Sequence, residues 1–411
     1  MMAGCSNKTG SNSSDSTAQK KVTLNFAVNF SATEAVNNDL KDIAANFTKE
    51  NPNIEVQIAT LPDYEATMKT KMAANDLPDI FSTHGWSVAR YSEYLTPLQD
   101  QPWSSKLNPL IKPVVTDKDG KIYVLPMDVD VAGITYNKDV LDEAGVDPNA
   151  IKTWDDFKTA CEKIKAKGKT PIQLGGVKDD WTVGNFCDFV APSFLITNDS
   201  KNYRNQLLDG TFDWKNYAPV YQLFNDFNKS GYFNKDAKEG TYQSVSEALG
   251  KGKAAFAFFG NFVLSDAMKI NGNANYGFMP IPAVTSDDTP TVIAGESKAF
   301  GVWKDSKNKA EAIKFLDYMA KSENINKIAA TDLNPTGLVG DGYKTDAGKL
   351  TQYFEKAQSA RAFGYFDRTY LPNGMWDSLV NTGSAMLFDN MTSDQVSQKL
   401  KEDYDKLRKQ K

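Results

Sequence analysis

The side chains of this sequence that could do chemistry are aromatic rings and planar polar groups that follow predicted strands. Aromatic rings can stack on the apolar C–H faces of a ligand, and carboxylates and amides can each bond two adjacent hydroxyls. In open α/β sheets such groups lie in loops beyond the carboxyl ends of strands. By this rule the candidate ligand-binding residues are Asn29, Phe30, Glu34, His84, Trp86, Asp128, Asp130, Trp181, Phe259, Asn261, Glu296, Asn373 and Trp376.

Tryptophan offers the largest face for stacking, and the seven tryptophans fall into two groups. Trp86, Trp181 and Trp376 lie in predicted loops, Trp181 at the end of 175–181 and Trp376 after Pro372. In loops a ligand role is about as frequent as a packing role. The other four lie within or at the ends of regular elements and are predicted to be core residues: Trp103, Trp154, Trp214 and Trp303.

Each polar candidate also has a structural role open to it. His84 is the only histidine, and a single histidine beside a glycine is more often a hydrogen-bonded structural residue than a ligand contact. Asp128 and Asp130 could cap a loop, and Glu34 could be a charge in the first turn of a helix. Three nearby charged residues could pair with one another and are left out of the candidate set: Arg361, Asp367 and Arg368.

The acids also raise the question of catalysis. Hydrolysis of a glycosidic bond needs two carboxylates at a fixed separation, one with a raised pKa. Spacing alone does not exclude such a pair among Glu34, Asp128, Asp130 and Glu296. The sequence has no Gly-x-Ser-x-Gly, no His-Glu-x-x-His and no phosphate-cradling glycine loop. Binding without catalysis is therefore predicted, with no catalytic residue.

Metal and cofactor sites are not predicted. One histidine and three cysteines (Cys5, Cys161 and Cys187) give no cluster of metal ligands. Residues 117–120 have the Asp-x-Asp-Gly pattern of a calcium loop, but a third oxygen ligand and a later glutamate are missing, so a hairpin turn is predicted. Cys161 and Cys187 have apolar neighbours and are predicted to be buried thiols, with a disulfide between them left open.

The overall composition is that of a globular protein large enough for two domains. The 411 residues, 41% of them hydrophobic and 24% charged, exceed one ordinary core. A net charge of −5 and scattered basic residues argue against nucleic acid as a partner. No stretch approaches the ~20 consecutive apolar residues that cross a bilayer.

The N-terminal residues predict a membrane anchor of a different kind. Two small residues precede Cys5, as at the end of a bacterial lipoprotein signal, although the charged and apolar regions of such a signal are absent from the sequence. Residues 6–17 contain no apolar side chain, which is typical of a flexible tether. We expect a lipid on Cys5 to hold an extracellular body at the cytoplasmic membrane. A disordered tail with an incidental cysteine is the alternative.

Alternating strands and helices must position the candidate side chains. Hydrophobic residues alternate over 22–28 and 54–58 and fall at helical spacing over 36–47 and 64–72. This order is typical of a mainly parallel sheet covered by helices. Further strands are predicted at 77–81, 122–126, 131–136, 252–260, 277–282 and 297–303, and helices after Thr153, within 181–234, over 310–319 and through most of the last hundred residues.

Seven segments, taken in order, resemble the extracellular sugar-binding proteins of ABC importers, in the lipoprotein branch related to maltose-binding protein. No single segment identifies the family, but seven of them in the expected order do. The resemblance covers essentially the whole chain from Val22, with one difference: Phe262 stands where such proteins often have tryptophan. The segments are 77–81 (LPDIF), 119–126 (DGKIYVLP), 134–140 (ITYNKDV), 153–157 (TWDDF), 252–262 (GKAAFAFFGNF), 277–283 (GFMPIPA) and 297–303 (SKAFGVW).

The resemblance implies a two-lobed α/β fold of the periplasmic-binding-protein type (class II), with a ligand cleft between lobes joined by a multi-strand hinge. It implies that a monomer captures a sugar, here expected to be an oligosaccharide, by lobe closure and delivers it to the ABC permease. A binder of a polyamine or peptide, or less often a glycoside hydrolase, is the alternative. The predicted parts are an anchor and tether at 1–21, lobe one at 22–131 plus 292–345, and lobe two at 132–291 plus 346–411.

Overall fold

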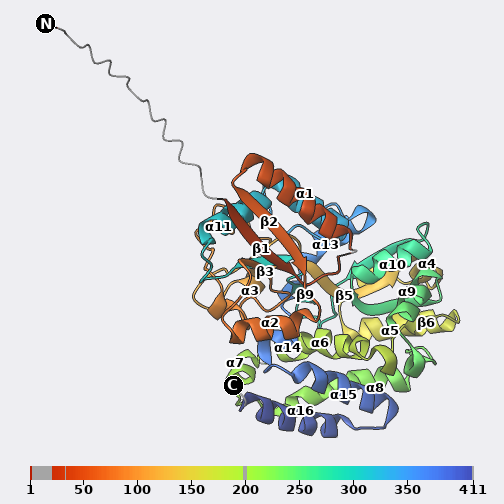
Figure 1. The fold of residues 1–411 in the computed structure, drawn as a ribbon. Helices are drawn as coiled ribbons and strands as arrows, with labels where there is room; N and C mark the ends of the chain where they lie inside the picture. Colours follow the sequence, from red (N-terminus) through yellow and green to blue (C-terminus); the bar gives the residue numbers. More distant parts are fainter. Residues whose placement is uncertain (2–20, 33, 198–200, 410–411) are drawn as a thin grey trace.

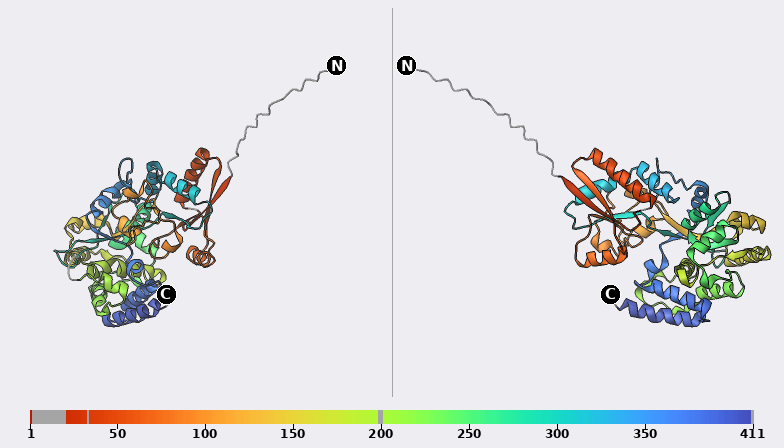
Figure 2. Two further views of the ribbon diagram at one scale, coloured as in Figure 1. Left: turned by 90° about the vertical axis from the view of Figure 1, so that its left-hand side faces the viewer. Right: turned by 45° about the vertical axis from the view of Figure 1, so that its right-hand side comes forward.

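Two β-sheets, each covered by helices, form two lobes (Figures 1 and 2). The computed structural model describes residues 1, 21–32, 34–197 and 201–409. Cys5, the predicted lipid-bearing residue, lies outside these ranges. Within them, no helix is both long and apolar enough to cross a membrane.

The first sheet confirms the predicted strand–helix–strand order. Its strands are β1 (Val22–Val28), β2 (Ile54–Thr60), β3 (Ile80–Ser82), β4 (Leu125–Pro126) and β10 (Ala299–Val302). They are ordered β2-β1-β3-β10-β4. β1, β2 and β3 run parallel, and β10 runs antiparallel to β3 and β4. The strand predicted at 122–126 is reduced to its last two residues.

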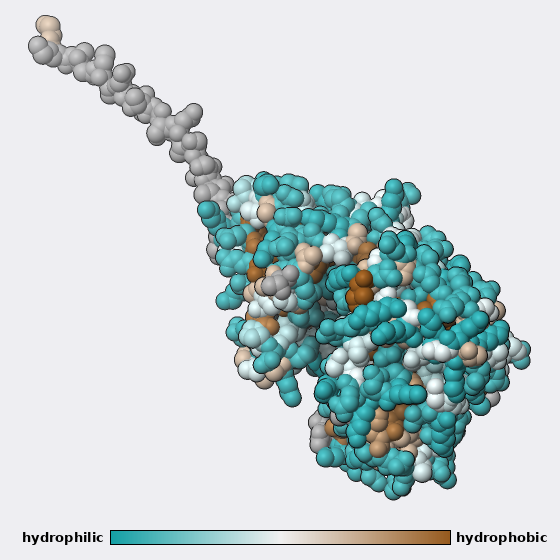
Figure 3. All heavy atoms as spheres, turned by 90° about the vertical axis from the view of Figure 1, so that its right-hand side faces the viewer, coloured by the Kyte–Doolittle hydropathy of each residue, from teal (hydrophilic) through white to brown (hydrophobic). Residues whose placement is uncertain are grey.

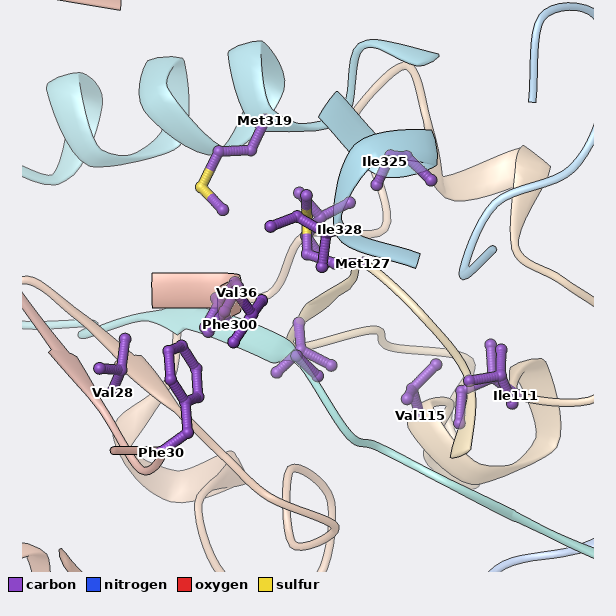
Figure 4. Packing of buried hydrophobic residues seen from close by; sticks show 14 of the residues in the cluster. Val28, Phe30, Val36, Ile111, Val115, Met127, Phe300, Met319, Ile325 and Ile328 are labelled. Carbon is purple, nitrogen blue, oxygen red and sulfur yellow. The ribbon is translucent and has the colours of Figure 1, made fainter. Parts of the chain in front are cut away.

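Helices of this lobe pack against the sheet. They are α1 (Ala35–Glu50), α2 (Tyr64–Ala73), α3 (Lys112–Val115), α11 (Lys309–Met319) and α12 (Ser322–Thr331). α1 packs on β2, and α11 packs on β1 and β10. Figure 4 shows Phe300 of β10 near Val36 of α1, with Ile328 of α12 close by. The rings of Phe300 and Phe26 meet edge to face at 4.8 Å between centroids, so aromatic packing connects β10 with β1 across the intervening β3.

The second sheet is built around a strand that runs against its neighbours. It contains β5 (Asp130–Asn137), β6 (Thr170–Ile172), β7 (Ala254–Gly260), β8 (Tyr276–Met279), β9 (Thr291–Gly295) and β11 (Arg361–Phe363). The order is β11-β9-β5-β7-β6, with β8 also paired to β5. β5 is antiparallel to β7, β8 and β9, whereas β6 is parallel to β7 and β11 is parallel to β9.

Helices cover both faces of this sheet, and β7 shows how. β7 is buried along its whole length. Phe256 and Phe258 pack into the cluster on one face, and Ala257 and Phe259 into the cluster on the other, as the two-residue period of a strand requires. The helices of this lobe are α4 (Lys138–Glu143), α5 (Trp154–Ala166), α6 (Trp181–Leu195), α7 (Arg204–Asp209), α8 (Ala218–Lys229), α9 (Tyr242–Gly250), α10 (Phe262–Ile270), α13 (Thr351–Ala357), α14 (Phe366–Tyr370), α15 (Met375–Phe388) and α16 (Ser393–Arg408).

Short segments join the two sheets. Residues 127–129 connect β4 to β5, and residues 296–298 connect β9 to β10. The chain crosses a third time between α12 and α13. Because β5 and β9 both belong to the second sheet, the predicted breaks at 131/132 and 291/292 fall inside its strands. The division into lobes at those residues remains a proposal.

Several local predictions can be compared with the structure. The turn at 117–121 is confirmed: the Asp117 N–H donates to the Lys121 carbonyl at 3.0 Å. Cys161 and Cys187 are confirmed as buried free thiols. The last hundred residues are not helical throughout, because β11 pairs with β9. Short 3₁₀ turns complete the described chain at Ser92–Tyr94, Ser104–Lys106, Pro148–Ala150, Val177–Asp179, Trp214–Tyr217, Ala237–Glu239 and Gly348–Leu350.

The predicted helix start at Thr153 supplies a test of local stability. The Thr153 hydroxyl accepts the Asp156 N–H, and the Asp156 carboxylate accepts the Thr153 N–H at 2.9 Å, so each satisfies a free helix-end donor. We expect Thr153→Ala to lower the free energy of unfolding by about 1 kcal/mol, measured by urea denaturation. Thr159→Ala, inside the same helix, is the control. Equal losses in the two variants would contradict the capping role.

Candidate functional site

Two sheet edges face each other across the crossing segments. β1, β3 and β4 end, and β10 begins, at one edge. β7, β9 and β11 end, and β5 begins, at the other. Since residues 127–129 and 296–298 join these edges directly, the loops at both lie close together. Figure 3 shows the surface hollowed between the lobes. Most of the predicted ligand-binding residues lie along these two edges.

Arg368 of α14 reaches from the second lobe to the first. Its guanidinium carbon lies 4.3 Å from the centre of the Trp86 ring and 4.2 Å from that of Tyr365. Its Nη1 donates to the carbonyl oxygen of His84 at 3.3 Å. All three contacts are those expected of a guanidinium, which stacks on rings and donates in its own plane. A single side chain thus connects the loop after β3 with the segment after β11.

The loop after β3 is shaped to admit this guanidinium. His84 and Gly85 both have left-handed backbone angles, with φ of 43° and 89°. A Cβ on Gly85 would lie 2.2 Å from Arg368 Nη1. Glycine is therefore required here both for the turn and for the close approach of Arg368.

Trp86 and His84 lie in a positively charged neighbourhood. A second guanidinium, that of Arg90, lies 4.1 Å from the Trp86 ring centre and pairs with Glu65 at 2.6 Å. Desolvation in the cleft, together with the charges of Arg368, Lys298 and Arg90, lowers the pKa of His84. The imidazole is neutral at physiological pH, so it can offer one donor and one acceptor.

Asp130 is the predicted carboxylate that keeps one oxygen available to accept a hydrogen bond from a ligand. Its Oδ2 accepts the Tyr365 hydroxyl at 2.7 Å. A Cβ atom built on Gly260 would lie 3.0 Å from the Asp130 Oδ1 and 2.9 Å from the ring edge of Phe262. Among the described residues no hydrogen bond reaches Oδ1. Burial raises the pKa of Asp130, and the Tyr365 hydroxyl opposes this rise. An acceptor oxygen and an exposed ring are therefore close neighbours.

Glu296 instead holds the loop after β3. Its side chain is 3% exposed. Its Oε2 accepts the Thr83 hydroxyl at 2.6 Å, and its Oε1 accepts the Ser87 N–H at 3.2 Å together with the Ser87 hydroxyl. Both oxygens of this predicted ligand-binding residue are thus bonded to the loop that carries His84.

Asp128 holds the crossing segments together. It is completely buried. Its Oδ1 accepts the Lys298 N–H at 2.8 Å and its Oδ2 accepts the Asn334 amide at 2.7 Å, while the Val129 N–H donates to the Pro335 carbonyl at 2.9 Å. Burial raises the pKa of Asp128 to about 6, against the opposing charge of Lys298. The structure joins this predicted ligand-binding residue to the third crossing.

Aromatic rings gather at the end of β7. Trp181 lies 5.5 Å from both Tyr242 and Phe259, and Phe262 lies 5.8 Å from Tyr242, between ring centroids. Phe259 is buried and Phe262 is 39% exposed. Phe262, in the place where tryptophan was expected, therefore presents the exposed face of this group. Trp181 opens α6 and is not in a loop as predicted.

The remaining predicted residues have different surroundings. Asn29, which follows β1, has a buried side-chain oxygen that meets no hydrogen-bond partner within the described part of the chain, and the Phe30 ring lies 5.3 Å from the Lys298 ammonium. Glu34 is exposed and accepts the Ser31 N–H. Asn261 is buried and donates to the Leu333 carbonyl at 2.7 Å, again between the lobes.

Asn373 and Trp376 lie further along the second lobe. Asn373 is exposed in the loop before α15. Trp376 is the second residue of α15, not a loop residue as predicted, because the helix begins directly after the left-handed Gly374. The Trp376 ring packs against Gly184 of α6.

Sequence analysis missed Tyr365 and left Arg368 out of the candidate set, although both side chains lie between the two lobes. Both follow β11, and the rule that selects loops after strands would have found them had that strand been predicted. Arg361, which could have paired with Asp367, instead pairs with Asp288 at 3.2 Å.

The sequence and the fold can now be compared with those of known proteins. Residues 31–325 match the family described as bacterial extracellular solute-binding protein. The melibiose/raffinose/stachyose-binding protein MelE of Bacillus subtilis is 35% identical over 415 residues, which cover 100% of this chain and 94% of that protein.

Two solved structures share this arrangement. A Bacillus subtilis binding protein, solved in an open conformation, has a TM-score of 0.89 at 34% identity and covers 95% of this chain and 98% of its own. A Bacillus licheniformis sugar transporter protein in complex with stachyose has a TM-score of 0.78, also at 34% identity, and covers 94% and 100%. The predicted two-lobed α/β fold is confirmed.

The Gly85 turn provides a test of the Arg368 contact. Gly85→Ala and Gly120→Ala both place Cβ at a φ near 80–90°, and we expect each to cost about 1–2 kcal/mol in unfolding free energy. Of these two sites, only Gly85 has a neighbour among the described residues, Arg368, within 4 Å of the new methyl group. Gly85→Ala should therefore also move the guanidinium off Trp86, seen as a shifted Trp86 resonance in fluorine NMR of protein containing 5-fluorotryptophan. An unshifted resonance would contradict the contact.

Proposed function

The chain belongs to the family of bacterial extracellular solute-binding proteins, and from that premise we propose that it captures an oligosaccharide between its lobes and delivers it to the membrane-spanning subunits of an ABC importer. Asp130 carries the proposal. Its free oxygen lies beside the exposed ring of Phe262, and its other oxygen is held by Tyr365. A sugar ring needs this combination, an aromatic face for its C–H groups and an acceptor for its hydroxyls.

Relatives support the ligand class. The relative that is 35% identical is named for binding melibiose, raffinose and stachyose, and the neighbour at 34% identity was solved with stachyose. Both cover nearly the whole chain. We therefore place the ligand among oligosaccharides of two to four sugar units, which would extend from the Phe262 ring along the two facing edges.

Capture by closing of the lobes follows from the connections between them. Segments of three residues are short enough to bend as a hinge while each sheet stays rigid. At equal sequence identity, this chain superposes better on the relative in an open conformation than on the stachyose complex, which supports two arrangements of the same lobes. Closure would remove water from the ligand and strengthen each hydrogen bond to it.

Binding without catalysis is part of the proposal. Glycoside hydrolysis requires two available carboxylates on opposite sides of the bond. Of the four acids considered, Asp128 and Glu296 have both oxygens occupied and Glu34 is exposed. Asp130 alone fits the requirement, and one carboxylate does not make a pair.

A lipid on Cys5 would hold the body at the outer face of the cytoplasmic membrane, beside the permease. The sequence around Cys5 supports this proposal, and the family is extracellular. A monomer is sufficient for the function, since both sides of the cleft come from one chain.

Calorimetric titration tests the ligand class. We expect stachyose, raffinose or melibiose to bind saturably with a Kd near or below the micromolar range, about −8 kcal/mol, and each sugar to be recovered intact. Spermidine and a short peptide serve as comparison ligands. Turnover of a bound sugar would contradict the absence of catalysis, and binding of spermidine or peptide without any sugar would contradict the ligand class.

Asp130→Asn tests the central contact. The substitution keeps the size of the side chain and removes its charge, so the affinity for the best sugar should fall about tenfold to a hundredfold, which corresponds to 1.5–3 kcal/mol for a hydrogen bond to a charged group. Glu162→Gln is a matched control, because Glu162 also accepts a tyrosine hydroxyl, that of Tyr232, at 2.7 Å but lies on α5. Equal affinities of Asp130→Asn and the control would refute the role of Asp130.

A further inference from the structure

Asp188 is a buried carboxylate that takes no part in the cleft itself. It lies in the middle of α6 and is completely inaccessible to solvent. Its Oδ2 accepts the N–H of Phe366 at 3.0 Å, and its Oδ1 accepts the N–H of Asp367 at 2.7 Å. Each oxygen therefore binds one of the two N–H groups that open α14.

These hydrogen bonds fix the segment that enters the cleft. α14 has only five residues, Phe366–Tyr370, and a helix of this length is not stable by itself. Tyr365 immediately precedes it and Arg368 lies within it. Phe189, next to Asp188 on α6, packs against the Tyr365 ring at 6.0 Å between centroids. Neighbouring residues of α6 thus hold both the backbone and the first ring of this segment.

A buried carboxylate at this position is energetically unfavourable. Burial raises the pKa of Asp188 well above its usual range, and the nearby charge of Asp367 raises it further, whereas the two N–H groups oppose the rise. Removing a carboxylate from water costs several kcal/mol unless its oxygens are satisfied. An asparagine would avoid this cost but could not accept one N–H on each of two oxygens, because its amide has only one oxygen.

We propose that Asp188 is a positioning residue for the ligand site: by holding the start of α14, it sets where Tyr365 and Arg368 stand in the cleft and thereby sets the affinity for the sugar. The inference rests on the proposed function for its ligand, but the placement of α14 can be tested without one. According to this proposal, Asp188, in the core of the second lobe, affects the contact that Arg368 makes with the first lobe.

Asp188→Asn tests the positioning directly. One oxygen becomes an NH₂ group that faces an N–H donor, so α14 loses a hydrogen bond and gains a repulsive contact. We expect faster hydrogen exchange of amides 365–371, measured by mass spectrometry without ligand, and at least a tenfold higher Kd for stachyose. Asp79→Asn is the matched control: Asp79 is also buried and accepts a backbone N–H, that of Asn25 at 2.9 Å, but it precedes β3 at the edge away from the cleft.

A double-mutant cycle separates positioning from general damage. If Asp188 acts through Tyr365 and Arg368, adding Asp188→Asn to the Tyr365→Phe/Arg368→Ala variant should change the Kd for stachyose by less than twofold. A loss in that background as large as in the wild type would overturn the proposal. So would a folded Asp188→Asn variant with unchanged exchange at 365–371 and unchanged affinity.

Further outcomes are also decisive. Asp188→Ser keeps one acceptor without adding volume and replaces Asp188→Asn if that variant does not fold. If neither variant folds, Asp188 is a residue of core stability and the positioning role is wrong. If the wild type binds neither stachyose nor raffinose nor melibiose, the proposed function fails, whereas the exchange measurement still decides whether Asp188 holds α14.

Discussion

The hydrogen bonds of Asp128 connect all three segments between the lobes. Its carboxylate accepts from Lys298 in the segment 296–298 and from Asn334 in the segment between α12 and α13, and Asp128 itself lies in the segment 127–129. The two sheet edges can face each other only because these segments run side by side, and everything in the cleft depends on that facing. The Lys298 ammonium lies 3.0 Å from the Asp332 carboxylate and also balances the charge of the buried Asp128.

Much of the fold could be predicted because local signals agreed with the tertiary structure. Alternating residues over 22–28 and 54–58, the helical spacing between them and the capping pair at Thr153 all point to the elements that form. β11 could not be predicted in this way. It has three residues, two of them half-buried, so it shows no alternation, and it exists because the edge of β9 is there to pair with.

The candidate site was harder to predict than the fold. Position after a strand correctly brings His84, Trp86 and Asp130 into one cleft. The same rule also selects Asp128 and Glu296, whose oxygens are occupied by partners 170 or more residues away in the sequence. Residue type and spacing show that an oxygen is present but not whether it is free. Hydrogen-bond accounting in three dimensions makes that distinction.

The contact between Arg368 and Trp86 has a consequence for ligand exchange. In this arrangement the indole already has two guanidiniums against it, so a ligand that stacks there must displace one of them. The affinity of such a ligand would be the difference between two competing contacts on the same ring. A displaced guanidinium that stayed nearby would compete with the ligand for the ring and favour its release. A binding protein that delivers its ligand to a transporter needs efficient release as well as high affinity.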